Sequence, residues 1–426
     1  MKEILYLAVP KPETMNKVIS TFICLLFLLP GACKQEKASD DNVIIGKIDK
    51  IHSKILDEER TIWVYVPKGN PLGAEQKFPV VYLLDGEAHF YSVMGMIQQL
   101  SEVNGNMIVP QMILVGITNT NRTRDLTPTH VESYAQLDSA FLKPSGGGEV
   151  FTSFLEKELI PYVDSVYPVL PYRTLIGHSF GGLMVMNTLI NHTDLFNAYI
   201  AIDPSMWWDD KKLLEQSADV LGKKDFKGKT LCLAVANTMA QGMDTSAVLS
   251  DTTKGTEHIR AALVMGRYLE KNTKNNLKHS FKYYNDDSHG SVPLIAEYDA
   301  FRYIFSFYRP DIDFARMEDT TYMIDSALNR YSEVLTENFG FPFPAPESFI
   351  NMLAYNYMSI KMYDMAFKLF DMNIRNYPQS PNVYDSMGEL LMNKGDTTGA
   401  IRNYEKSLEL SPGNTNAKQM IAKMKE

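Results

Sequence analysis

The feature that most constrains the fold is a series of short, nearly continuous apolar runs, such as residues 112–117 and 231–236. Polar residues do not alternate with apolar ones in these runs, which suits strands buried on both faces of a parallel sheet. Segments with helical spacing separate them, and strand and helix in turn predict a doubly wound α/β sheet. The expected strands are 43–48, 61–67, 77–84, 112–117, 173–176, 199–202, 231–236 and 281–284, and the expected helices are 151–166, 183–191, 258–272 and a final one near 298–307.

Length and charge narrow the class of protein further. A chain of 426 residues, 45% hydrophobic and 22% charged, is typical of one large globular domain plus a smaller one. Its net charge of -9 leaves no basic surface to neutralise many phosphates, so we expect no nucleic-acid partner. Three cysteines exclude a disulfide framework and a Cys-rich zinc site.

Residues 1–33 have the layout of a secretory signal. An apolar run of about a dozen residues follows Lys17 and is too short to span a bilayer as a stable helix. It ends in Pro-Gly-Ala before Cys33, which resembles a bacterial lipoprotein processing site with Cys33 as the acylated residue, although Pro30 departs from the usual aliphatic residue. Residues 34–42 form a polar tether, and Met15 is a second candidate start for the signal.

We therefore expect an exported protein that contacts the membrane only through its lipid anchor. The expected location is the cell envelope, at the periplasmic or outer-membrane face. A plain signal peptide with an incidental cysteine is the alternative, and it predicts a periplasmic or secreted protein.

The C-terminal part carries an internal repeat. After the domain expected at 43–308, helical segments follow one another through a linker at 309–345, and the Pro-rich stretch 341–346 marks a boundary. A shift of 34 residues aligns Ala354 with Gly388, Ala366 with Ala400, Phe370 with Tyr404 and Pro378 with Pro412. Residues 346–426 thus resemble a pair of tetratricopeptide repeats (TPR) with a terminal helix, and an unrelated helical tail is the alternative.

The chemistry concentrates at the Gly-His-Ser-Phe-Gly-Gly sequence of residues 177–182. A short strand precedes it and a helix follows it, which is the setting that a nucleophile elbow requires. Glycines at 177 and 181 are needed because the turn is sharp and side chains there would collide with the adjoining backbone. The motif predicts Ser179 as an exposed nucleophile at a helix N-terminus.

A serine hydroxyl needs a base to take its proton. Of the eight histidines, His289 lies in a loop after the last expected strand and before the final helix, where α/β hydrolases carry their base. We therefore predict His289 as the base, with a merely solvated loop histidine as the alternative. His192 and His258 fall in expected helices.

Six motifs in order resemble the esterase family that includes enterobactin (ferric-siderophore) esterases, esterase D and feruloyl esterases. They are residues 61–67, 81–86, 124–128, 177–182, 203–208 and 289–293. The resemblance implies an α/β-hydrolase fold, a nucleophile at Ser179 and a base at His289. It also implies an oxyanion hole made of two backbone N–H groups, from Phe180 and from the loop near Gly86 or Glu87.

The triad acid is where the sequence departs from that family. Relatives often place Asp or Glu directly after the strand at 231–236, but residues 237–241 contain no carboxylate. Asp251, near the start of the next helix, is our first choice, although it could equally cap that helix. The other candidates are Asp244, Glu257 and Asp203, and a Ser-His dyad without an acid is also open.

Other side chains suggest a substrate site. Trp207 and Trp208 follow a strand end near the elbow and are expected to wall an acyl or aryl pocket, unless they pack beneath a lid. Arg122 and Arg124 could contact an anionic substrate, although Arg124 and Asp125 fit a structural ion pair better. No His, Asp or Glu spacing recommends a metal site, and no cofactor is expected.

The residues and the resemblance together predict an exported serine esterase that forms an acyl-enzyme on Ser179. Its substrate would be a siderophore-type or acylated-glycan ester. Two alternatives stay open. One is a catalytically degenerate hydrolase scaffold whose TPR-like tail binds a protein or peptide at the cell envelope, and the other is an acyltransferase that uses the same residues.

Overall fold

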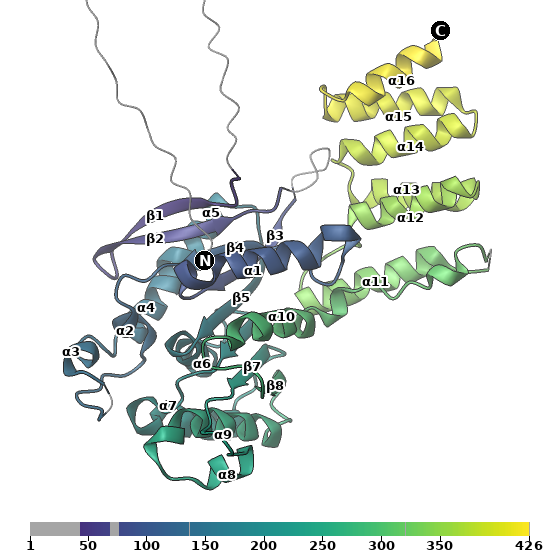
Figure 1. Cartoon of the computed structure of the whole chain (residues 1–426). Helices are drawn as coiled ribbons and strands as arrows, with labels where there is room; N and C mark the ends of the chain where they lie inside the picture. The colour runs from purple at the N-terminus through teal and green to yellow at the C-terminus, as the bar shows by residue number, and fades with distance from the viewer. Residues whose placement is uncertain (1–42, 69–75, 136, 320, 426) are drawn as a thin grey trace, which may run out of the picture. The chain divides into compact units, whose positions relative to one another are not determined.

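The computed structural model describes residues 43–68, 76–135, 137–319 and 321–425 (Figure 1). The predicted signal and Cys33 lie outside these residues. Eight strands form one sheet in the order β1-β2-β4-β3-β5-β6-β7-β8. The strands are β1 (Lys47–Ser53), β2 (Glu58–Tyr65), β3 (Phe78–Leu83), β4 (Ile113–Ile117), β5 (Val169–His178), β6 (Ala198–Ile202), β7 (Thr230–Ala236) and β8 (Lys278–Tyr284).

The six strands from β4 to β8 in the sheet order are parallel, whereas β2 pairs antiparallel with both β1 and β4. Every residue of β3, β4, β6 and β7 is buried, as the continuous apolar runs predict for strands covered on both faces. The predicted α/β fold is confirmed.

Helices cover both faces of the sheet (Figure 1). The apolar cluster on one face takes side chains from α1 (Gly86–Ser101) and α10 (Val292–Ile304). The cluster on the other face takes them from α4 (Gly148–Phe154), α5 (Ile160–Val166), α6 (Phe180–Asn191), α7 (Trp208–Lys223) and α9 (Glu257–Lys271). Parallel strands end at one edge of the sheet, and this edge brings together the loops that follow β5, β6, β7 and β8.

The chain after α10 is helical, as predicted. It contains α11 (Ile324–Phe339), α12 (Glu347–Ser359), α13 (Tyr363–Asn376), α14 (Pro381–Asn393), α15 (Thr397–Leu410) and α16 (Thr415–Lys425). Gly388 lies against the ring of Tyr404, where a Cβ would come within 3.1 Å of ring carbons, so the repeat's small residue does permit close helix packing. The TPR identity of this region stays a prediction. None of the described helices is both long and apolar enough to cross a membrane.

Candidate active site

Ser179 sits on a sharp turn between β5 and α6. Its backbone has φ 60° and ψ -113°, a conformation that costs a non-glycine residue on the order of 1–3 kcal/mol. The turn requires glycine at 177, because a Cβ there would lie 2.3 Å from the carbonyl oxygen of Gly181. This strained backbone places the Ser179 side chain at the N-terminus of α6, and the strand, turn and helix together form the predicted nucleophile elbow.

Asp203 follows β6 directly and holds His289. Its side chain is fully buried, and its Oδ2 lies 2.6 Å from His289 Nδ1. Its Oδ1 accepts the backbone N–H of Ala236 at 3.0 Å. Burial by itself would raise the pKa of Asp203, but hydrogen bonds from His258 and His289 outweigh it and hold that pKa well below its usual value. Asp203 is therefore an ionised carboxylate beneath the imidazole.

His258 is a second histidine on the same carboxylate. It projects from α9, and its Nε2 lies 2.9 Å from Asp203 Oδ2. The indole N–H of Trp207 donates to the other ring nitrogen of His258, Nδ1, at 3.0 Å. The potential donor and acceptor atoms of Asp203, His258 and His289 lie within 4.8 Å of one another, and these hydrogen bonds account for that grouping.

Ser179 and His289 line one cavity of about 370 Å³. Within the described residues no hydrogen bond joins the two side chains, and the Ser179 hydroxyl lies 3.4 Å from that of Ser205. Hydrogen bonds between catalytic groups are often long until substrate binds. The other lining residues are Tyr134, Leu137, Phe180, Ser205, Trp207, Thr238, Lys254, Gly255, Glu257 and His258.

The two predicted oxyanion donors come from adjoining helix starts. Phe180 is the first residue of α6 and Glu87 the second residue of α1, and N–H groups in the first turn of a helix have no intrahelical acceptor. The turns adjoin, because a Cβ on Gly181 would lie 3.2 Å from Asp85 Oδ2. The Glu87 carboxylate accepts hydrogen bonds from Asn119, so only its backbone is available for such a role. That role stays a prediction.

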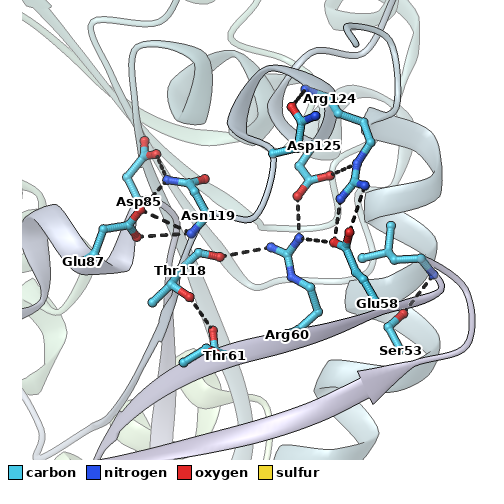
Figure 2. A network of polar contacts seen from close by, with 12 residues as sticks. Ser53, Glu58, Arg60, Thr61, Asp85, Glu87, Thr118, Asn119, Arg124 and Asp125 are labelled. Atoms are coloured by element: carbon cyan, nitrogen blue, oxygen red, sulfur yellow. Dashed lines mark hydrogen bonds and ion pairs between the residues drawn. The ribbon is translucent and has the colours of Figure 1, made fainter.

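Arg122 links the turn before α1 to the nucleophile elbow. Its guanidinium pairs with Asp85 through two hydrogen bonds of 2.6 and 2.8 Å, and it also donates to the carbonyl of His178 at 3.3 Å. Figure 2 shows Asp85 and Glu87 together around Asn119. Arg122 is thus committed to the scaffold of the site.

A second ion network supports the segment that carries Arg122 (Figure 2). Arg60 on β2 is 1% exposed and donates to Asp125 at 2.6 Å and to Glu58 at 2.9 Å. Arg124 pairs with Glu58 and with Asp125 at 2.6 and 2.7 Å. The structural ion pair expected for Arg124 and Asp125 is confirmed.

The two tryptophans take different places, so the prediction that both wall the pocket is half wrong. Trp207 lines the cavity, and its ring lies 4.7 Å from that of Tyr134 between centroids. Trp208 is 2% exposed, donates its N–H to the carbonyl of Thr129 and packs edge-on against Phe180. Adjacent residues point in different directions, which leaves Trp208 in the core.

The structure does not bring Asp251 to His289, so our first choice of acid is corrected. Asp251 ends α8 (Thr245–Ser250), and its carboxylate accepts hydrogen bonds from the backbone of Thr252 and Thr253 and the hydroxyls of Thr253 and Thr256. Asp244 caps α8, and Glu257 binds Tyr134 and Lys254. Asp203, ranked among the alternatives, is the carboxylate on His289.

His258 is a site residue that the sequence does not reveal. It falls in an expected helix with no sign of a function, because its ring meets Asp203 only after α9 packs beside the carboxyl ends of β6 and β7. The one sequence signal is that Trp207 and Asp203 belong to a single motif, and it does not point to a residue more than 50 positions later.

The fold and the site define the chain as an α/β hydrolase with a nucleophile elbow. Residues 53–292 match the model of the esterase family described as "Putative esterase", which is more than half of the chain, and the protein belongs to this family.

Among curated proteins, the chain is similar to the ferri-bacillibactin esterase BesA of Bacillus subtilis, with 30% identity over 176 residues that make up 38% of this chain and 59% of BesA. It is 28% identical over 149 residues to a siderophore enterobactin esterase of Emericella nidulans, covering 32% of this chain and 49% of that one. The matches thus span only about half to three fifths of these relatives.

Among solved structures, an IroE-like serine hydrolase from Shewanella oneidensis is 30% identical, with a TM-score of 0.66, over 78% of this chain and 99% of the other. An uncharacterised protein from Capnocytophaga ochracea shares the fold at 16% identity, with a TM-score of 0.56, over 89% of this chain and 99% of that one.

Proposed function

We propose that this protein is an exported serine esterase that hydrolyses a carboxylic ester through an acyl-enzyme on Ser179. The observation that carries the proposal is that an elbow serine and an Asp203-bound histidine line one cavity in a member of an esterase family. His289 has the carboxylate partner that a catalytic base requires, and it shares the cavity with the serine from which it would take a proton.

The proposed reaction starts at His289. Its Nδ1–H donates to Asp203, which leaves Nε2 free to accept the hydroxyl proton of Ser179. The serine oxygen bonds to the ester carbonyl carbon, and the oxyanion accepts hydrogen bonds from the N–H groups of Phe180 and Glu87. When this tetrahedral intermediate collapses, the ester C–O bond breaks and His289 gives the proton to the departing alcohol. Water then attacks the acyl-enzyme by the same steps in reverse order, and releases the acid.

The substrate we propose is a siderophore-type ester. Relatives of the chain are named for siderophore esters, and the cavity presents two aromatic rings, Tyr134 and Trp207, that suit a flat aryl or acyl group. Lys254 Nζ lies 5.1 Å from the centroid of the Tyr134 ring and is paired with Glu257, so this wall carries an ion pair beside the two rings. An acylated-glycan ester with an aromatic acid would fit the same two rings, so it is the second substrate to test.

The test is an ester panel that includes p-nitrophenyl acetate, a siderophore trilactone and a feruloylated glycan. Wild-type protein should turn over at least one of these esters and bind a fluorophosphonate, and Ser179→Ala should do neither. Ser205→Ala is the matched control, since it removes a serine hydroxyl 3.4 Å from that of Ser179 and should keep the label. Wild-type turnover by an intact Ser179→Ala protein would refute the mechanism. Product analysis with added alcohols separates hydrolysis from acyl transfer.

We also propose that the protein is exported and acylated at Cys33. The support is the short apolar run with small residues before this cysteine and a polar tether after it. Metabolic labelling with a palmitate analogue should mark the wild-type protein and Cys24→Ala, but not Cys33→Ala. Equal labelling of the two variants would count against the anchor.

A further inference from the structure

Two imidazoles share one oxygen of the Asp203 carboxylate. His289 Nδ1 lies 2.6 Å and His258 Nε2 lies 2.9 Å from Oδ2, and the two rings stand edge to face with centroids 5.1 Å apart. A triad needs only the first of these contacts. The second comes from a side chain that is 23% exposed at the cavity wall and that the reaction scheme does not use.

Trp207 fixes the tautomer of His258. An indole nitrogen can only donate, so His258 Nδ1, 3.0 Å away, must be the acceptor and carry no proton. Its proton is therefore on Nε2 and points at Asp203. A doubly protonated His258 would set its Nδ1–H against the indole N–H, so the chain of three residues is intact only with a neutral ring.

We propose that His258 is a positioning residue for ester hydrolysis, and that Trp207 locks it so that its Nε2–H holds the Asp203 carboxylate in place beneath His289. This inference rests on the proposed function. Asp203 is anchored on Oδ1 by Ala236 and on Oδ2 by His258, so the carboxylate cannot turn away when the imidazole above it moves toward substrate.

Loss of the His258 hydrogen bond should also change the pH dependence of turnover. The N–H of His258 neutralises part of the Asp203 charge, and without it the full charge would stabilise protonated His289 more strongly. The acidic limb of the pH–rate profile should then move to higher pH. Three groups face His289: Asp203 after β6, His258 on α9, and His178 on β5, whose ring centroid lies 4.4 Å from that of His289. Lys254 and Glu257 line the same cavity as an ion pair. Asp286 and Asp287 belong to the loop of His289 itself.

The decisive variants are His258→Leu and His258→Gln. Leucine removes both hydrogen bonds, whereas the glutamine amide can accept from Trp207 and donate to Asp203. His258→Leu should lose about 10- to 100-fold in kcat/KM, the size expected for a hydrogen bond to a charged group, and its acidic limb should rise by about half to one pH unit. His258→Gln should stay within a few-fold of wild type with an unmoved limb. His192→Leu, a histidine paired with Glu149 away from the cavity, is the matched control.

A merely structural role would lower the rate without moving the limb, and that result, or full activity in His258→Leu, would overturn the inference. Folding of each variant is checked by circular dichroism.

A measurement without turnover keeps the inference separate from the proposed function. In Ser179→Ala protein with ¹⁵N-labelled histidine, the His258 resonances should show a neutral ring protonated on Nε2 near pH 7, and Trp207→Phe should perturb them. A ring protonated on Nδ1, or on both nitrogens, would overturn the inference. An inactive wild-type protein would defeat the proposed function and leave this tautomer reading intact.

Discussion

Replacing Asp203 with asparagine tests the acid of the site most directly. The carboxylate accepts three N–H groups, two on Oδ2 from imidazoles and one on Oδ1 from Ala236. An amide has one acceptor oxygen and one NH₂ donor, so either orientation sets NH₂ against at least one of these donors. With the oxygen toward Ala236, the NH₂ group faces both histidines and favours the wrong tautomer of His289.

The size of the effect follows from these contacts. Asp203→Asn should lower kcat/KM by about 10³- to 10⁴-fold, or about 4 to 5.5 kcal/mol, because the imidazole loses both its orientation and the charge that stabilises its protonated form. Each hydrogen bond to a charged group is worth about 1.5–3 kcal/mol net, so the free energy of unfolding should also fall. Rates on p-nitrophenyl acetate and urea unfolding measure the two effects separately.

Asp251→Asn is the matched control. Its carboxylate contacts local threonine and backbone groups beside α8, with Arg260 4.0 Å away, so we expect activity within about three-fold of wild type and a smaller loss of stability than in Asp203→Asn. A folded Asp203→Asn protein with near wild-type turnover would refute the reasoning. So would an Asp251→Asn protein as impaired as that predicted for Asp203→Asn.

Three further predictions concern the pH dependence of stability and the elbow turn. Burial raises the pKa of Glu297, which is 1% exposed, to about 8, so the folded state keeps this proton at pH values where the unfolded chain has lost it. The free energy of unfolding of the wild type, measured in urea, should therefore fall as the pH rises from about 4.5 to 8, and Glu297→Gln should remove that fall. Burial, together with the neighbouring His289, lowers the pKa of His178 to about 4, so as the pH falls the unfolded chain binds this proton before the folded state does. The wild type should therefore lose stability relative to His178→Gln as the pH drops from about 6.5 to about 4. Gly177→Ala should abolish fluorophosphonate labelling because its Cβ meets backbone, whereas Gly290→Ala, with open space around that Cβ, should keep it.

The sequence predicted β3, β4, β6 and β7 to within one residue at each end, because strands buried on both faces leave unbroken apolar runs. The expected first strand at 43–48 lies instead at Lys47–Ser53, where the strand is not buried on both faces. The run at 112–117 became Ile113–Ile117, and the run at 231–236 became Thr230–Ala236. The positions of Ser179 and His289 in the site were also predictable, since the elbow is a local glycine pattern and His289 follows the last strand.

The acid and His258 could not be predicted in the same way. Which carboxylate at a strand end contacts an imidazole depends on the order of the strands across the sheet and on the direction of each side chain. The local spacing of residues in the sequence gives neither. Asp203 leaves β6 with φ 40°, a backbone conformation that aims its carboxylate beneath the loop after β8 and that the sequence gives no means to foresee. His258 additionally requires the packing of α9.

Asn237 occupies the position directly after β7, where the sequence lacks a carboxylate. Its backbone N–H donates to the carbonyl of Asp287 at 2.8 Å, and its side-chain amide donates to the carbonyl of Asn285 at 2.9 Å. Asn237 therefore holds the backbone of the loop that carries His289, while Asp203, one strand closer to the nucleophile, holds the ring. An asparagine suits this position because its NH₂ group can donate to a carbonyl, which an aspartate cannot do. Moving the acid to β6 thus leaves the β7 end free to position the histidine loop, and it puts the carboxylate within reach of a helix that can supply His258.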